Sequence, residues 1–110
     1  MKYVKVAEVS QLPANQMLMV TVEGKQILLA NVDGAYHAID NKCNHLGGSL
    51  AKGELIGSVV TCPRHGAQFD VTTGNTVGKA KIAMIKMQVK DQESYQVKVE
   101  GSEILLGMPE

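Results

Sequence analysis

The sequence predicts an all-β fold, either an antiparallel sandwich or a small barrel, and three observations lead to this prediction. Short apolar runs recur along the whole 110-residue chain, and turn-forming residues separate them. Two segments near the C-terminal end alternate apolar and polar residues with a period of two, as strands with one buried face do. Eleven glycines are spread over the chain. Many short strands joined by glycine-containing turns are typical of sandwiches and barrels.

The N-terminal part of the chain contains the clearest turn signals. Residues 7–13 (AEVSQLP) are the one segment with the pattern of a short helical turn. The apolar runs at 17–22 and 26–32 flank the sequence EGK at 23–25, so we expect a hairpin there. An Asp-Gly pair at 33–34 follows, and this dipeptide between apolar stretches is the strongest short-range hairpin signal. Two successive hairpins are therefore expected.

Residues 41–57 do not follow this pattern, because they contain four glycines and show no sustained period. Residues 59–62 (VVTC) have the composition of a strand, and residues 63–68 (PRHGAQ) leave it again. The segments that contain cysteine and histidine are therefore expected to be two loops, each beside a strand. Loops carried by a rigid sheet are where functional sites are usually built.

The C-terminal part returns to the strand pattern. Residues 85–89 and 95–99 place apolar side chains at every second position, with polar side chains between them. Both segments are expected to be strands with one face in the core and one face in water. A last strand is expected at residues 103–106 (EILL).

Length and composition limit the class of protein. A chain of this length corresponds to one domain, which we place at residues 1–110. The formal net charge is zero at pH 7, so there is no basic excess for binding nucleic acid. We see no signal peptide and no apolar stretch long enough for a bilayer, so we expect a cytoplasmic protein that makes no membrane contact. Two cysteines in that compartment indicate metal or redox chemistry more often than a disulfide.

The cysteines and two of the three histidines form one pattern: Cys43-x-His45, a gap of sixteen residues, and Cys62-x-x-His65. Four nitrogen and sulfur ligands suit a tetrahedral structural zinc ion. Zinc modules, however, usually pair cysteine with cysteine and histidine with histidine, whereas here each loop supplies one of each. That symmetry favours a two-metal centre in which both thiolates bind one iron and both imidazoles bind the other, as in a Rieske [2Fe–2S] cluster.

The run from Asn31 to Asn75 resembles the Rieske iron–sulfur family, whose signature is C-x-H, a spacer, and C-x-x-H. The resemblance extends to the sequences around the ligands, CNHLGGSL and TCPRHGAQFD, and to the Thr-Gly turn at 73–74. It implies a Rieske-like antiparallel β-sandwich with small barrels and a two-loop cluster-binding subdomain at about 41–75.

The resemblance also implies the role of each ligand. Cys43 and Cys62 would bind the inner iron as thiolates. His45 and His65 would bind the outer iron through one ring nitrogen each, with the other nitrogen facing solvent. Glycines in the two loops would let backbone N–H groups approach the bridging sulfides, since no Cβ intervenes.

Four departures from the family's high-potential members predict a low-potential cluster. Those members have a disulfide between cysteines at the positions of Gly48 and Arg64. They also have hydroxyl donors, a serine and a tyrosine, at the positions of Ala67 and Phe69. A hydrogen bond to a charged sulfur grows stronger as negative charge accumulates, so each donor favours the reduced state. Without the two donors the midpoint potential should be lower by on the order of 100 mV.

The resemblance implies an electron-transfer protein and not an enzyme, since only His37 remains unassigned and is expected to be an ordinary strand residue. A flavin-dependent reductase would supply one electron, and an oxygenase or similar acceptor would receive it, with the ferredoxin acting as a monomer. Two alternatives remain open. One is a small subunit of an assimilatory nitrite reductase-type complex, and the other, from a different class, is a structural zinc-binding module.

Overall fold

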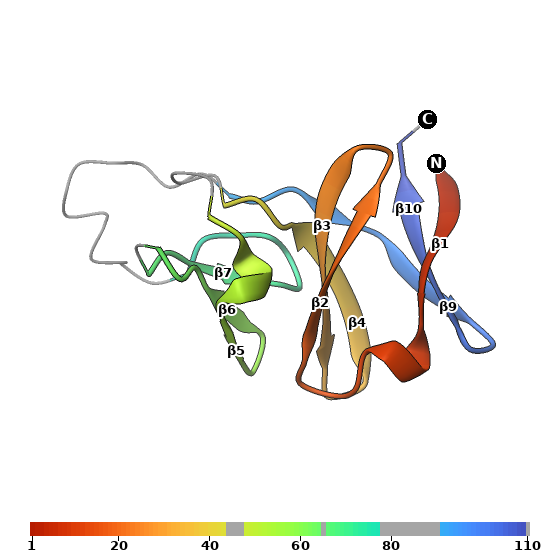
Figure 1. Cartoon of the computed structure of the whole chain (residues 1–110), viewed down its shortest axis with the longest axis horizontal. Helices are drawn as coiled ribbons and strands as arrows, with labels where there is room; N and C mark the ends of the chain where they lie inside the picture. Colours follow the sequence, from red (N-terminus) through yellow and green to blue (C-terminus); the bar gives the residue numbers. More distant parts are fainter. Residues whose placement is uncertain (44–47, 65, 78–90, 110) are drawn as a thin grey trace.

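The computed structural model describes residues 1–43, 48–64, 66–77 and 91–109. Strands dominate this part of the chain, and two short 3₁₀ helices (η1 and η2) connect them (Figure 1). In chain order, the elements are β1 (Lys2–Glu8), η1 (Val9–Gln11), β2 (Met17–Val22), β3 (Lys25–Val32), β4 (Ala35–Asp40), η2 (Leu50–Lys52), β5 (Glu54–Ile56), β6 (Val59–Thr61), β7 (Gln68–Asp70), β8 (Ser94–Tyr95), β9 (Val97–Glu100) and β10 (Glu103–Met108).

The strands form three sheets, and every described strand pair is antiparallel. The strand orders are β1-β10-β9, β2-β3-β4-β8 and β5-β6-β7. In Figure 1 the four-stranded sheet lies in the middle, with the small β5-β6-β7 sheet on one side and the β1-β10-β9 sheet on the other. The predicted all-β, antiparallel fold is confirmed.

Strand β3 explains this three-layer arrangement, because both of its faces are buried. Its residues 27–31 are all buried, where a strand with one wet face would alternate. Leu28 and Ala30 belong to one hydrophobic core, and Ile27 and Leu29 belong to another. The sequence ILLA is therefore a central strand between two layers.

The two cores have different memberships, and only one of them contains the cysteines. We call the first the cysteine core, and its buried members are Leu28, Ala30, Ile39, Cys43, Leu50, Val60, Cys62, Ala67, Phe69 and Val71. We call the second the terminal core, and its buried members are Ala7, Leu12, Val22, Ile27, Leu29, Ala38, Ile104, Leu106 and Met108. The terminal core draws on both ends of the chain, since β1 pairs with β10 from Lys2↔Met108 onward.

Both predicted hairpins are confirmed, and their turns have the geometry that the residues favour. Glu23 and Gly24 have φ values of 51° and 81°, and Asp33 and Gly34 have φ values of 51° and 94°. Two successive residues with positive φ match the twist of antiparallel strands, as in a type I′ turn. Glycine takes the second position of each turn without steric cost.

The other predictions for the two ends of the chain are confirmed only in part. The helical turn expected within 7–13 is η1, which follows directly on strand β1, and β1 itself carries no strong signal in the sequence. The C-terminal strands at 95–99 and 103–106 are present as β8, β9 and β10. Val99, expected to face the core, is 43% exposed, because β9 is the edge of its sheet. The strand expected at 85–89 lies outside the described residues.

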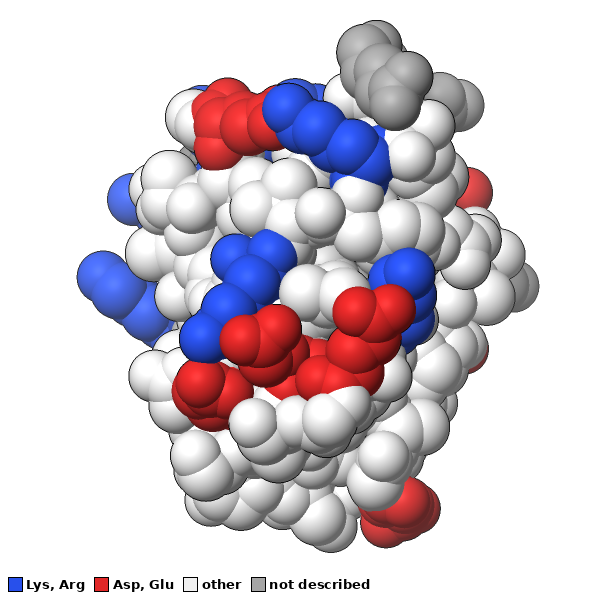
Figure 2. All heavy atoms as spheres, turned by 90° about the vertical axis from the view of Figure 1, so that its right-hand side faces the viewer, with Lys and Arg blue, Asp and Glu red and all other residues white. Residues whose placement is uncertain are grey.

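The face formed by the β1-β10-β9 sheet carries charges of both signs (Figure 2). Lys5 forms ion pairs with Glu8 at 2.9 Å and with Glu103 at 3.4 Å, and Lys98 pairs with Glu100 at 3.2 Å. All of these side chains are well exposed, so each pair contributes little to stability. Over the described part of the chain, no helix has the length and apolar character needed to cross a membrane.

Candidate metal centre

The first cysteine lies at the start of a closed loop that leaves the central sheet. Strand β4 ends at Asp40, and an isolated bridge between Lys42 and Ser49 brings the two ends of the following loop together. The backbone N–H of Cys43 donates to the carbonyl of Gly48 at 2.7 Å. Cys43 is therefore held at the base of a loop that includes His45 in its sequence, and its side chain is buried.

The second cysteine has the same arrangement one layer away. Cys62 follows β6, and its backbone N–H donates to the carbonyl of Ala67 at 2.7 Å. Within this loop, the Gly66 N–H donates back to the Cys62 carbonyl at 3.1 Å, and Gly66 has a φ of 76°. In both loops the cysteine N–H thus bonds to the carbonyl five residues later. This shared closure was not predicted, because it is a backbone property with no fixed residue type.

The two loops lie against one another at Gly48. A Cβ built on Gly48 would lie 3.0 Å from the Sγ of Cys62 and 3.1 Å from the Cγ of Arg64. Only a residue without a side chain leaves the Cys62 sulfur its present space. The closeness of Gly48 and Arg64 agrees with the inference that these positions correspond to the disulfide-linked pair of the high-potential relatives.

Both cysteines are 2% exposed, belong to the same apolar core and form no disulfide. Two thiols in one dry core suit a soft, thiolate-binding centre such as iron–sulfur or zinc. His45 and His65 lie outside the described residues. Among the described residues, no three His, Cys, Asp or Glu side chains gather as a metal site would require, so the four-residue ligand set remains a prediction.

Two further residues beside the second loop bear on the redox potential. Ala67 is 1% exposed and Phe69 is fully buried, and both belong to the cysteine core. Phe69 lies on β7 opposite Val60 of β6, the strand that leads to Cys62. Neither side chain has a hydroxyl group, so neither donates a hydrogen bond to a sulfur.

The third histidine lies on the central sheet. His37 is on β4 opposite Ala30 of β3, and it lines a cavity of about 260 Å³ with neighbours that include Thr72 and Tyr95. Its place in a paired strand agrees with the expectation for this residue.

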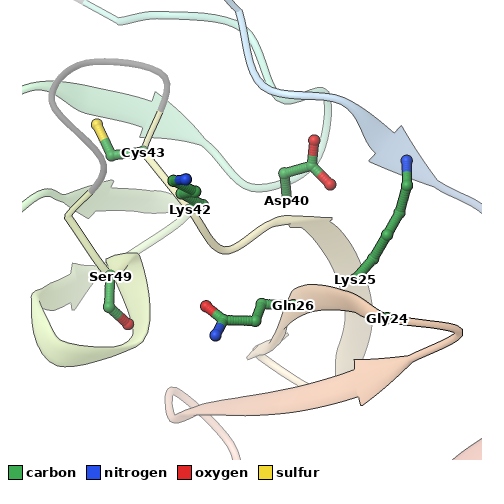
Figure 3. A pocket seen from close by; sticks show the side chains of 7 residues that line it. All are labelled: Gly24, Lys25, Gln26, Asp40, Lys42, Cys43 and Ser49. Carbon is green, nitrogen blue, oxygen red and sulfur yellow. The ribbon is translucent and has the colours of Figure 1, made fainter.

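A polar groove runs along the surface beside Cys43 (Figure 3). It has a volume of about 780 Å³, and its lining residues are Gly24, Lys25, Gln26, Asp40, Lys42, Cys43 and Ser49. The hydroxyl of Tyr95 donates to the Asp40 carboxylate at 2.6 Å. Burial and this hydrogen bond together raise the pKa of Tyr95 above its ordinary value, so the phenol stays protonated in neutral solution.

Two buried amide side chains near the first loop went unnoticed in the sequence. Asn41 is fully buried and Gln92 is 3% exposed. The Asn41 side chain bonds to Ser49 and Ala51, which follow Cys43, and Gln92 bonds to the carbonyls of Asp40 and Lys42, which precede it. Asn41 stands two residues before Cys43, so its position was a usable signal. The sequence gives no such signal for Gln92, since this residue lies about fifty positions from its hydrogen-bond partners.

The fold and these two loops define a class of protein, small all-β domains that bind a metal centre between two cysteine-containing loops. The family model of the Rieske [2Fe-2S] domain matches residues 2–87. This chain belongs to the Rieske [2Fe–2S] family, and its cofactor is a [2Fe–2S] cluster, which is favoured over the zinc alternative. The resemblance seen in the sequence is confirmed.

Among curated proteins, the chain is similar to the ferredoxin component of the naphthalene 1,2-dioxygenase system of Pseudomonas aeruginosa. The two are 34% identical over 107 residues, which cover 97% of this chain and 96% of that protein. Among solved structures, the ferredoxin of carbazole 1,9a-dioxygenase from Nocardioides aromaticivorans IC177 has a TM-score of 0.84 and 29% identity, with 96% and 97% of the chains covered. A chain from the complex of reduced oxygenase and oxidized ferredoxin in carbazole 1,9a-dioxygenase has a TM-score of 0.82 and 25% identity, with 94% and 91% covered.

Proposed function

We propose that this protein is a Rieske-type ferredoxin that carries one electron from a flavin-dependent reductase to an oxygenase. The observation that carries the proposal is the pair of buried cysteines on two adjoining loops of a Rieske domain. Near full-length similarity to ferredoxin components of dioxygenase systems supports the role of electron carrier. The solved complex of an oxygenase with a ferredoxin supports an oxygenase as the acceptor.

In this proposal the four predicted residues hold the cluster. Cys43 and Cys62 would bind one iron through thiolates placed in the cysteine core, and His45 and His65 would bind the other. When bound, the [2Fe–2S] cluster supplies one-electron chemistry. Because both cysteine side chains are buried in an apolar core, that side of the site excludes water. Electron exchange takes place where the two histidines lie, over a small and weak interface suited to rapid exchange of partners.

The proposal includes a low midpoint potential. The residues at positions 67 and 69 supply no hydroxyl group to the sulfurs, so the reduced state lacks two donors that high-potential relatives have. A low potential suits a carrier that must pass its electron onward to an oxygenase. We further propose that residues 1–110 form a single Rieske domain with a cluster-binding subdomain at about 41–75. The protein would work in the cytoplasm as a monomer without catalytic activity of its own.

The cluster and its ligands are tested together by spectroscopy of the purified protein. We expect a brown protein whose reduced form gives the EPR spectrum of a cluster with mixed nitrogen and sulfur ligation. His65→Ala should lose this spectrum. His37→Ala is the matched control, because it removes the histidine of strand β4 and should leave the spectrum unchanged. A colourless wild-type protein that contains zinc would disprove the proposal.

The role as carrier is tested by reconstitution. Reduced protein should pass its electron to the oxygenase of a naphthalene 1,2-dioxygenase system in the absence of any permanent partner chain. A protein that holds the cluster but transfers electrons only as part of a stable complex would instead support the nitrite reductase-type subunit. A redox titration with a midpoint clearly above zero would contradict the low-potential part of the proposal.

A further inference from the structure

Two buried amides hold the base of the first cysteine loop, and we call Asn41 and Gln92 the amide clamp. Three polar residues are buried in the described part of the chain, and these are two of them; the third is Asn31. A buried amide is costly unless its donors and acceptor are paired. The partners of the clamp therefore show which segments it joins.

Asn41 joins the two ends of the loop. Its side-chain Nδ2 donates to the hydroxyl of Ser49 at 2.9 Å, and its Oδ1 accepts from the backbone N–H of Ala51 at 2.8 Å. Its backbone carbonyl accepts from the N–H of Leu50 at 2.9 Å, and its own N–H donates to the carbonyl of Gln26 on β3 at 3.0 Å. Asn41, which precedes the loop, thus fixes the segment that follows the loop and anchors both segments to the central sheet.

Gln92 holds the same segment from the other side. Its Nε2 donates to the carbonyls of Asp40 at 2.9 Å and Lys42 at 2.8 Å, the two residues that flank Asn41. Its backbone N–H donates to the carbonyl of Gly74 at 2.7 Å. Gly74 follows β7, which pairs with the strand leading to Cys62.

The contact at Gly74 leaves no room for adjustment. A Cβ on Gly74 would collide with the carbonyl oxygen of Gln92, so the two backbones are as close as they can be. Gln92 therefore connects the base of the first cysteine loop to the layer that carries the second cysteine. Figure 3 shows Asp40, Lys42, Cys43 and Ser49 gathered around this base.

We infer that Asn41 and Gln92 are positioning residues that set the place of Cys43 relative to Cys62, and thereby the ligand geometry of the cluster. This inference rests on the proposed function. Their side-chain bonds end on residues 40–42 and 49–51, the two stems of the loop, with one longer bond from Asn41 to the Gln26 side chain at 3.4 Å, and none ends in the terminal core. Loss of the clamp would let the base of the loop sample several positions, so the cluster would be less uniform and more easily lost.

The test compares Asn41→Ala and Gln92→Leu with the matched control Asn31→Ala. Asn31 is also a buried amide with one side-chain donor bond, to the Leu12 carbonyl at 2.9 Å, and one acceptor bond, from the Gly34 N–H at 2.8 Å. It lies away from the loop, so its loss should lower the melting temperature in the same way. All three changes are neutral in charge and add no electrostatic effect of their own.

Two readouts separate positioning from general stability: the rate of cluster loss to an iron chelator and the width of the EPR lines of the reduced protein. We expect both clamp variants to lose the cluster more than about fivefold faster than wild type, because a factor of about five corresponds to one lost hydrogen bond and each variant loses at least two. Their EPR lines should be broader, whereas Asn31→Ala should keep wild-type values for both. If Asn41→Ala does not fold, Ser49→Ala removes one bond of the clamp and should show a smaller effect of the same kind.

Clamp variants that match Asn31→Ala in cluster loss and line width would overturn the inference. A wild-type protein without the mixed-ligand EPR spectrum would overturn the proposed function instead. The two failures are therefore distinguishable in a single set of samples.

Discussion

At the scale of single residues, the space around the Cys62 sulfur shows why glycine stands at position 48. The neighbouring atoms of Cys62 and Arg64 occupy the place that a side chain would need. Gly48 is not among the glycines with a positive φ, so glycine is required here for space and not for backbone conformation. A substitution of Gly48 therefore acts on the space beside the Cys62 sulfur and not on the backbone conformation.

Gly48→Ala should disturb the cluster. The added methyl group would press on the Cys62 sulfur, so we expect lower cluster content and an altered EPR spectrum, at a cost of about 1–3 kcal/mol for overpacking. Iron content and EPR measure the effect. Gly57→Ala is the control, because Gly57 has a φ of 60° and open space around its Cβ position. That variant should lose about 1–2 kcal/mol of stability through backbone strain and keep the wild-type spectrum.

Phe69→Tyr should raise the midpoint potential. A hydroxyl at this buried position of the cysteine core would donate to a nearby sulfur, and the bond strengthens on reduction. We expect a rise on the order of 50 mV, which a redox titration would measure. Phe69→Leu repacks the site without adding a donor and should leave the potential nearly unchanged. Equal shifts in the two variants would show that repacking, and not the hydrogen bond, sets the potential.

At the scale of elements, short-range signals predicted some strands well and others poorly. The hairpins β2–β3 and β3–β4 were predictable because their Gly-containing turns are local. Strands β5 and β7 have three residues each, which is too short for a period to show. They exist because each pairs with β6. Tertiary pairing, and not intrinsic preference, decides such strands.

Strand β8 pairs with β4 through its backbone, and the Tyr95 side chain adds a contact that affects stability at alkaline pH. The Tyr95 hydroxyl bonds to Asp40 at the end of β4, and its pKa is raised by burial first and by this bond second. A raised pKa means that the stabilisation is fully present below the tyrosine's unfolded pKa, near 10, and is lost as the pH rises above it.

Tyr95→Phe should therefore weaken the loss of stability above about pH 10. Urea unfolding at several pH values between neutrality and the alkaline range measures this. Tyr36→Phe, on β4 itself, removes a hydroxyl without touching the Tyr95–Asp40 pair and should keep the wild-type slope. A Tyr95→Phe profile parallel to wild type at high pH would contradict the assignment.

At the scale of the whole molecule, one core carries the functional cysteines and the other core contributes only to stability. The cysteine core contains both thiols, whereas the terminal core contains neither and joins the two ends of the chain. The face over the terminal core carries mixed charges, which fits a structural surface more than a docking surface of one sign (Figure 2). The cluster would then stabilise one side of the molecule more than the other.

Removal of the cluster should loosen the two sides unequally. In the iron-free protein we expect backbone amides of β6 and β7 to exchange with deuterium faster, while those of β3 and β10 keep most of their protection. Hydrogen exchange of the loaded and iron-free proteins measures this difference. Uniform loss of protection across all four strands would show that the two cores fold as one unit.

The sequence by itself determined the family and the two hairpins with their turns, and its cysteine and histidine spacing predicted the four ligands. These features depend on residues close together in the chain, where spacing and turn chemistry are decisive. Only the tertiary structure decided that β3 is buried on both faces, that Gly48 faces the Cys62 sulfur, and that Gln92 holds the base of the Cys43 loop. Such contacts join residues far apart in sequence, so they exist only once both sides of the central sheet are packed.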